Sequence, residues 1–234
     1  MKNGRTGPEL ERNYRSLNIW ILCIVVVCFA SKSISGRSRS ENLEWKGLYS
    51  DNVKYAIKAP SPPDHKDHIA MARYIMHQAG WTSLATLSRI PEIQKYPFTS
   101  IVSMSDGTVL NSTGVPYFYL TPLDFPSKDL EVDCRCSISV SLMQTDFCKS
   151  KSYEADDPRC ARVMITGRME KMKNGTAEYD FAKDALFSRH PSMKNLPANH
   201  GFYVAKLEMK QIVMLAWFGG PTYIPIDQYL AFKP

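Results

Sequence analysis

The stretch that decides the fold is residues 134–142, CRCSISVSL, where two kinds of side chain alternate without a break. Every even position is Cys, Ile, Val or Leu, and every odd position between them is Arg or Ser. A period of two with one apolar side is typical of a β-strand with one face in the core and one in water. The run therefore predicts an antiparallel sheet with one buried face.

Strands of similar character surround this one. Residues 161–168 repeat the alternation, and two apolar, β-branched stretches at 201–209 and 211–218 precede the stop signal Gly219-Gly220-Pro221. Three further strands are predicted at 82–88, 100–105 and 115–120, the last after a turn at 111–114.

Helical spacing appears before and between these strands. Apolar residues recur every three or four positions in residues 65–79, where Asp64 is the expected N-cap and Gly80 the stop. A second helix is predicted at 177–188 after Thr176, and a short one at 226–231. Seven strands and these helices predict a mainly β, α+β fold: an antiparallel barrel, closed or nearly closed, with flanking helices.

Composition excludes several classes of protein. Of 234 residues, 44% are hydrophobic and 22% charged, which excludes disordered, collagenous and multi-span membrane chains. The net charge of +6 comes without a concentrated basic stripe, so we expect no nucleic-acid partner.

The N-terminal region has the order of a signal peptide: a basic lead, an uncharged run at 19–30 and a small polar stretch. Twelve residues make a helix of about 18 Å, shorter than a hydrocarbon core of about 30 Å, so no permanent membrane anchor is expected. We predict a signal peptide at 1–30, a flexible segment at 31–63 and a folded domain at 64–234. A short uncleaved signal-anchor is the alternative.

Secretion would leave Cys134, Cys136, Cys148 and Cys160 in an oxidising compartment, where three pairings are open. We favour Cys148 with Cys160, because that bridge would span the loop between two strands. Cys134 and Cys136 are too close in sequence for an easy mutual bond, and buried thiols remain as plausible there as any bridge.

Two N-glycosylation sequons, Asn111-Ser112-Thr113 and Asn174-Gly175-Thr176, lie in polar stretches beside turn signals. The common catalytic motifs are missing. His65 and His68, beside Asp64 and Asp67, have a spacing compatible with metal binding, but no third ligand accompanies them, so no metal site is predicted. Arg189 and His190 have the chemistry of an anion pocket, although structural roles are the simpler interpretation.

Several longer runs occur in a fixed order along the chain. They are SLATLS (83–88), GVPYFYLTPLD (114–124), QTDFC (144–148), LFSRHPSM (186–193), FYVAKLEM (202–209) and FGGP (218–221). In order and spacing this set resembles the CREG family of secreted cellular repressors, over residues 67–229.

The resemblance implies a split β-barrel of the type used by flavin-binding pyridoxamine-phosphate oxidases, assembled as a homodimer. It implies a glycoprotein, secreted or delivered to endolysosomes, with Asn174 at a family glycan position. Family members are regarded as lacking flavin activity and as acting on growth and differentiation, partly through receptors that read mannose-6-phosphate glycans.

Two hypotheses therefore compete. The first is a non-catalytic, homodimeric glycoprotein without a cofactor that modulates growth through a glycan-reading or growth-factor-type cell-surface receptor. The second is an oxidoreductase that retains the ancestral pocket and binds FMN or haem. By analogy with related flavin proteins, the residues that would hold a flavin phosphate are Thr86, Ser88, Arg162, Arg189 and His190.

Overall fold

The computed structural model describes residues 61–233, which belong to the compact unit Ala56–Pro234. The signal peptide predicted at 1–30, and all but the last residues of the segment predicted at 31–63, lie outside the described residues. Those assignments stay predictions. Within the described part, no helix is long and apolar enough to cross a bilayer.

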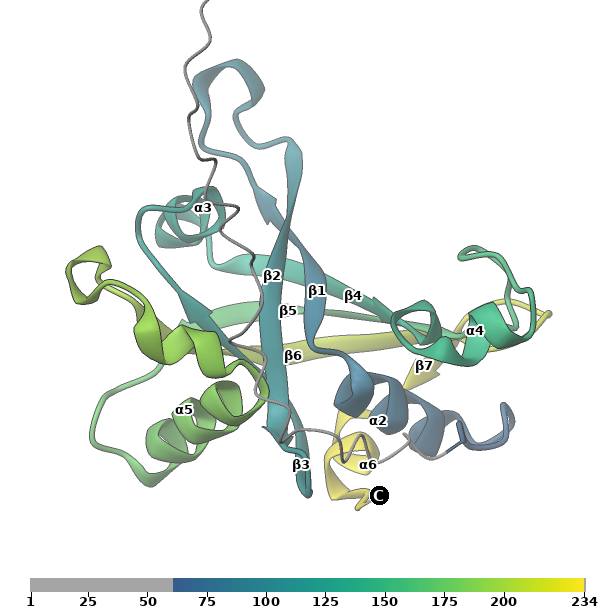
Figure 1. The fold of residues 1–234 in the computed structure, drawn as a ribbon. Helices are drawn as coiled ribbons and strands as arrows, with labels where there is room; N and C mark the ends of the chain where they lie inside the picture. The colour runs from purple at the N-terminus through teal and green to yellow at the C-terminus, as the bar shows by residue number, and fades with distance from the viewer. Residues whose placement is uncertain (1–60, 234) are drawn as a thin grey trace, which may run out of the picture. The chain divides into compact units, whose positions relative to one another are not determined.

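Seven antiparallel strands form one sheet in the order β3-β2-β1-β4-β5-β6-β7. Because β3 also pairs with β6, six of the strands close into a barrel and β7 extends the sheet outside it (Figure 1). The strands are β1 (Trp81–Leu87), β2 (Pro97–Thr108), β3 (Asn111–Leu120), β4 (Arg135–Ser141), β5 (Arg162–Lys171), β6 (Tyr203–Leu215) and β7 (Thr222–Ile224). The predicted split-barrel fold class is confirmed.

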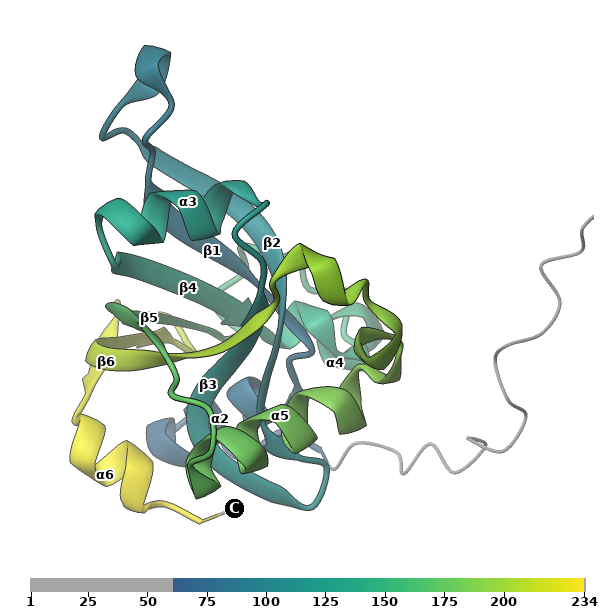
Figure 2. The same cartoon turned by 90° about the vertical axis from the view of Figure 1, so that its left-hand side faces the viewer.

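Helices lie at both ends and along one flank of the barrel (Figures 1 and 2). The helix α2 fills one end beside α6, α3 lies against β1 and β2 at the other end, and α5 packs on β2 and β3. The α-helices are α2 (His68–Gln78), α3 (Phe125–Val132), α4 (Asp146–Ser150), α5 (Ala177–Arg189) and α6 (Ile226–Ala231). Short 3-10 turns are η2 (Pro91–Ile93), η3 (Leu142–Gln144), η4 (Pro191–Asn195) and η5 (Ala198–His200).

The core follows the predicted periodicities. In β4 the side chains of Cys136, Ile138 and Val140 are buried, and on α2 Ile75 and Met76 join the same cluster. A second, smaller cluster holds α5 against the barrel through Ala182 and Leu186. Thr176 caps α5 by accepting from the Tyr179 N–H, as the sequence predicts.

Three predictions about local structure are wrong, and three elements were missed. Asp64 accepts from the Lys66 N–H in a local turn, so α2 begins at His68 with Asp67 as its cap. The strand expected from 115 starts at Asn111. The strands expected at 201–209 and 211–218 are the single strand β6, which passes a register shift opposite Thr166 and Gly167. The helices α3 and α4 and the strand β7 were not predicted.

The β2–β3 hairpin depends on one glycine. Gly107 has φ +148° and lies at a register shift, where an added Cβ would stand 1.9 Å from the Asn111 carbonyl oxygen. Only glycine fits so close an approach of two backbones. The hairpin therefore turns at Val109 and Leu110, and the predicted turn at 111–114 becomes part of β3.

Candidate functional site

The outer side of the sheet carries a continuous row of side chains that cross from β2 to β7. In this row each residue stands opposite the next on the neighbouring strand. The row is Ile101, Ser83, Ser139, Met164, Val213 and Tyr223. Both of its ends are open, since Ile101 is 64% and Tyr223 66% exposed.

A parallel second row consists of Thr99, Ala85, Ser137, Thr166 and Gln211. We call the two rows together the open face. All eleven side chains are exposed or half-buried, and none is charged. Charges begin at its borders, with Arg135 opposite Arg168 on one side and Arg162 opposite Leu215 on the other.

A sheet face without charges is unusual on a free surface. The centre of a protein–protein interface is depleted of charged residues and surrounded by a polar rim, as the open face is. The Ser137 and Thr166 hydroxyls hydrogen-bond to each other at 2.8 Å, which satisfies both side chains in the middle of the face. This arrangement suits the docking of another protein surface.

A buried carboxylate lies at the end of the barrel that α2 fills. Asp106 is fully buried; its Oδ1 is 2.8 Å from His77 Nδ1 and 3.6 Å from Arg189 Nη2. The Ser112 hydroxyl donates to its Oδ2. We call Asp106, His77, Arg189 and Ser112 the Asp106 cluster. This cluster joins α2, β2, β3 and α5. Burial lowers the pKa of Arg189 below its ordinary value, and the charge of Asp106 opposes that shift in part.

Arg73 continues this network toward the C-terminus. Its side chain is 1% exposed, and it donates to the carbonyls of Tyr229 and Phe232 and to Ser112. Gly114, at φ +79°, leaves room for the guanidinium, because an added Cβ would stand 2.8 Å from Arg73 Nε. The C-terminal helix α6 is therefore fastened by a buried cation.

A second buried carboxylate lies at the α3 end. Asp129 is almost fully buried and accepts from the Thr86 hydroxyl at 2.7 Å and from the Arg89 N–H at 2.9 Å. No basic side chain pairs with it among the described residues. This carboxylate joins α3 to the end of β1.

The five residues considered for a flavin phosphate lie in three separate places. Thr86 and Ser88 are at the α3 end, where Ser88 accepts from the Ile90 N–H. Arg162, at the other end of the sheet, donates to the Asp156 carbonyl. Arg189 and His190 are together near the end of β2, and His190 donates to the Met104 carbonyl. Each of the five side chains takes part in a hydrogen bond to another group of the described residues, and the five do not surround one pocket.

His65 and His68, whose spacing is compatible with metal binding, have no further ligand beside them among the described residues. His65 stacks on Trp217, with the ring centroids 4.2 Å apart. Among residues 61–233, no group of three or more His, Cys, Asp or Glu side chains is placed to hold a metal ion. His68 instead lines an open groove of about 620 Å³ between the start of α2 and β7.

Both sequon asparagines are exposed. Asn111 opens β3 beside the hairpin tip, and Asn174 lies in the turn before α5. In the folded chain the sequon residue Thr113 donates its hydroxyl to the Asp106 carbonyl at 2.7 Å. Carbohydrate at either asparagine would extend into solvent.

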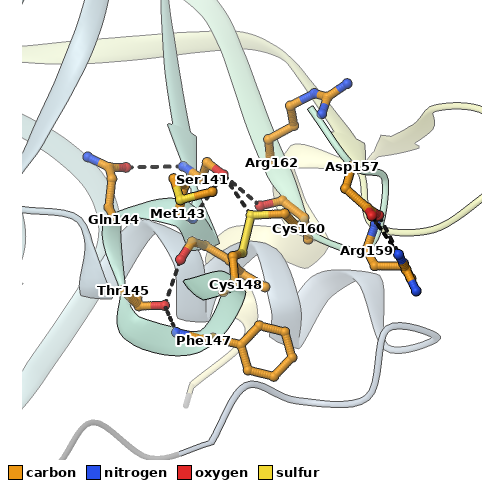
Figure 3. The surroundings of a disulfide bond; sticks show 12 residues. Ser141, Met143, Gln144, Thr145, Phe147, Cys148, Asp157, Arg159, Cys160 and Arg162 are labelled. Carbon is orange, nitrogen blue, oxygen red and sulfur yellow. Dashed lines mark hydrogen bonds and ion pairs between the residues drawn. A yellow bond between two sulfur atoms is a disulfide. The ribbon is translucent and has the colours of Figure 1, made fainter. Parts of the chain in front are cut away.

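Among the described residues there is one disulfide, between Cys148 and Cys160, which is the pairing favoured above (Figure 3). It bridges α4 and the start of β5, and the Ser141 hydroxyl lies 3.8 Å from Cys160 Sγ. Cys134 and Cys136 are free thiols. Burial, and next the nearby Cys134, raise the pKa of the Cys136 thiol to about 12.

Sequence reasoning singled out Arg189 and Thr86, but as candidates for a flavin phosphate, and it missed the buried carboxylates that they contact. Arg73 had a signal, since it follows Ile69 by four positions and precedes Met76 by three, on the apolar side of its helix. A charged residue in that position needs buried partners. Asp106, His77 and Asp129 had no comparable signal, because their partners come from distant elements.

Comparison with known sequences gives consistent matches. A family model described as CREG, beta-barrel matches residues 63–231. Protein CREG1 of Mus musculus is 34% identical over 223 residues, covering 95% of this chain and 96% of that protein. Protein CREG2 of Mus musculus is 38% identical over 189 residues, covering 81% of this chain and 65% of that protein.

Comparison with solved structures finds the same fold at low identity. A heme-binding protein from Mycobacterium smegmatis aligns with a TM-score of 0.55 and 22% identity, covering 73% of this chain and 62% of that chain. Atu2129 from Agrobacterium tumefaciens, a protein of unknown function, aligns with a TM-score of 0.52 and 20% identity, covering 73% and 63%. Such similarity establishes the fold and no activity.

Proposed function

Since this chain belongs to the CREG family, we propose that it is a binding protein rather than an enzyme: a homodimeric split barrel that modulates cell growth and differentiation. It acts from the extracellular space or the endolysosomal lumen. Its partner there is a glycan-reading or growth-factor-type receptor on the cell surface.

The observation that carries the proposal is the open face. A second copy of the chain is its best occupant, because a twofold axis brings a face against itself and so needs no opposite charges to match. The apolar ends of the first row, Ile101 and Tyr223, supply surface to bury, and the hydroxyl-rich middle packs closely. Charges at the borders remain in water.

Secretion and glycosylation are supported by separate features. The uncharged run at 19–30 fits a signal peptide, and a disulfide suits an oxidising compartment. Asn111 and Asn174 are exposed, so glycans at both positions are compatible with the fold. A receptor that reads glycans would meet them on the surface of the domain.

We propose no resident cofactor. The alternative, a flavin- or haem-binding oxidoreductase, would need a phosphate or porphyrin site, and the five candidate residues are already bound elsewhere in the monomer. Protein purified from a secretory expression host should therefore show only aromatic absorption. A stoichiometric flavin or haem band together with turnover of a substrate would establish the alternative.

The dimer is tested by sedimentation of the secreted full-length chain at micromolar concentration. We expect twice the monomer mass. Ser139→Lys places a charge in the centre of the open face and should give a monomer with unchanged circular dichroism. The matched control is Leu110→Lys, because Leu110 is 90% exposed on the hairpin tip, outside the open face. A monomeric wild type, or a dimer that survives Ser139→Lys, would contradict the proposal.

Glycosylation and receptor binding are tested together. Asn111→Gln and Asn174→Gln should each remove one glycan mass from the secreted protein. If receptors read the glycans, deglycosylated protein should lose cell-surface binding while remaining dimeric. Protein found in the cytosol, without carbohydrate and with reduced Cys148 and Cys160, would refute the localisation.

A further inference from the structure

Three sulfur-bearing side chains meet at the α3 end of the sheet. Cys134 and Cys136 are two positions apart, so on an extended chain they point to the same side. Arg135 stands opposite Arg168 in the ladder between β4 and β5. The preceding position, Cys134, therefore stands opposite Met169, whose N–H donates to the Cys134 carbonyl at 2.8 Å. Directly opposite residues have Cβ atoms about 4.5–5.5 Å apart, so the Cys134 thiol and the Met169 thioether are neighbours.

The Cys136 thiol points toward the same place. The residue opposite Cys136 is Gly167, which contributes no side chain. Burial first, and next the nearby Cys134, raise the pKa of the Cys136 thiol, and the N–H of Met169 lowers it in part through a hydrogen bond to the sulfur. A hydrogen bond acts only at short range. The Cys136 sulfur therefore lies beside the backbone of Met169 and near Cys134.

The spacing of the two thiols disfavours a disulfide between them. Two positions along an extended strand span about 6.8 Å. Disulfide-bonded residues have Cα atoms about 4.4–6.8 Å apart, so a bond between Cys134 and Cys136 would stand at the limit of that range. Both thiols are free in the structure. A metal ion between two sulfur atoms lengthens the link by one atom, so it bridges thiols that a direct bond does not join easily.

The ligand set indicates which ion fits. Thiolate and thioether sulfurs are soft ligands, which select Cu(I). Structural Zn²⁺ takes four Cys, His or carboxylate ligands, and within residues 61–233 no group of even three is placed to hold a metal ion. Access is available, since Cys134 is half-buried and Met169 lines a cavity of about 200 Å³. Lys171 lines the same cavity and carries a positive charge, which suits a monovalent cation held by two thiolates.

We propose that Cys134, Cys136 and Met169 bind one Cu(I) ion as an exchangeable ligand. Each thiol releases its proton to water, and the two thiolates and the thioether each donate an electron pair to copper, which stays monovalent. Because Cu(I) has a full d shell, it adds no visible absorption band, so the spectrum expected above is unchanged. The site lies within one chain and does not depend on the proposed function.

The test is an anaerobic titration of the secreted full-length protein with Cu(I), in competition with bicinchoninate, a coloured chelator of that ion. Cys134→Ser should weaken binding by more than about 100-fold, because loss of even an outer-shell partner costs about 10–100-fold. Met169→Leu, which nearly conserves volume, should weaken it about tenfold. Met172→Leu is the matched control and should bind as the wild type, since Met172 is similarly buried but belongs to the other core cluster.

Two measurements on the loaded protein locate the ion. Copper should protect Cys134 from maleimide, which peptide mass spectrometry detects in the wild type without any variant. X-ray absorption should find three sulfur neighbours around copper in the wild type and two in Met169→Leu. Binding that is unchanged in Cys134→Ser or Met169→Leu, a Cys134 thiol that still reacts in the loaded protein, or copper surrounded only by nitrogen and oxygen would overturn the proposal.

Discussion

The two ends of the barrel each bury one carboxylate, but they satisfy it with different chemistry. At the α2 end Asp106 faces His77 and Arg189, and the neighbouring Arg73 fastens α6. At the α3 end Asp129 accepts only from neutral donors, Thr86 and a backbone N–H. A buried carboxylate can therefore join elements with or without a counter-charge.

The cysteines follow the same division. Cys148 and Cys160 are bridged at the α2 end, where Gln144, between β4 and α4, donates to the carbonyl of Trp81 at the start of β1. Cys134 and Cys136 stay reduced at the α3 end, next to the first residue of β4. The buried ion pairs of Asp106 and the disulfide are thus both at the α2 end, and the changes below test how much of the stability depends on them.

The largest effect is expected from Arg73→Met. It leaves the carbonyls of Tyr229 and Phe232 without a donor in a buried position, so we expect a loss of about 3 to 5 kcal/mol in the free energy of unfolding. Urea unfolding measures it, and hydrogen exchange should show α6 losing protection first. Arg168→Met, on the exposed side of β5, is the control and should be close to neutral.

Removing the disulfide should come next. A double Cys148→Ala, Cys160→Ala variant reopens a loop of 12 residues, for which chain entropy gives a loss of about 3 kcal/mol. Thermal unfolding under matched conditions would detect it. Cys136→Ala, which removes one of the two free thiols, is the comparison. If it destabilised the protein more than the double variant does, the disulfide would not make the α2 end the more strongly stabilised one.

The two carboxylates can be compared directly. Asp106→Asn leaves Arg189 without its buried counter-charge and should cost about 3 kcal/mol, whereas Asp129→Asn keeps a neutral acceptor for Thr86 and should cost about 1 kcal/mol. The measurement is denaturant unfolding of both variants near neutral pH. Equal losses would show that the counter-charge at the α2 end has no net effect.

The smallest effect is chemical rather than energetic. Because burial raises the pKa of Cys136 to about 12, almost none of its thiolate is present at mildly alkaline pH. Within residues 61–233, a maleimide reagent should modify the native protein at one thiol, that of the half-buried Cys134, without unfolding it. Mass spectrometry of peptides locates the label, and equal labelling of both thiols would mean that the α3 end opens readily.

Much of the sheet could be read from the sequence because its signal is local. The alternation in β4 and β5 predicts both the strands and their buried sides, and Thr176 predicts the start of α5. The errors occur where a strand is continued past an irregularity: Gly107 allows β3 to begin at Asn111, and β6 passes a register shift without ending. A glycine or a polar residue inside a strand looks like a turn until its partner strand is known.

The candidate site was less accessible to sequence reasoning. The residues of the open face were visible as the polar positions of predicted strands, but their alignment into charge-free rows depends on register. The five residues considered for a flavin phosphate had the right chemistry, yet the fold places them in three regions.

The sequence by itself determined the fold class, the family and most strand and helix positions, since each follows from periodicity, caps or motifs within a short stretch. Only the tertiary structure decided the Asp106 cluster, the fastening of α6 by Arg73 and the open face. Each of these joins residues that are far apart along the chain; Arg73 and Tyr229, for example, are 156 positions apart. Such contacts depend on how strands register and helices dock, and a local pattern does not record that.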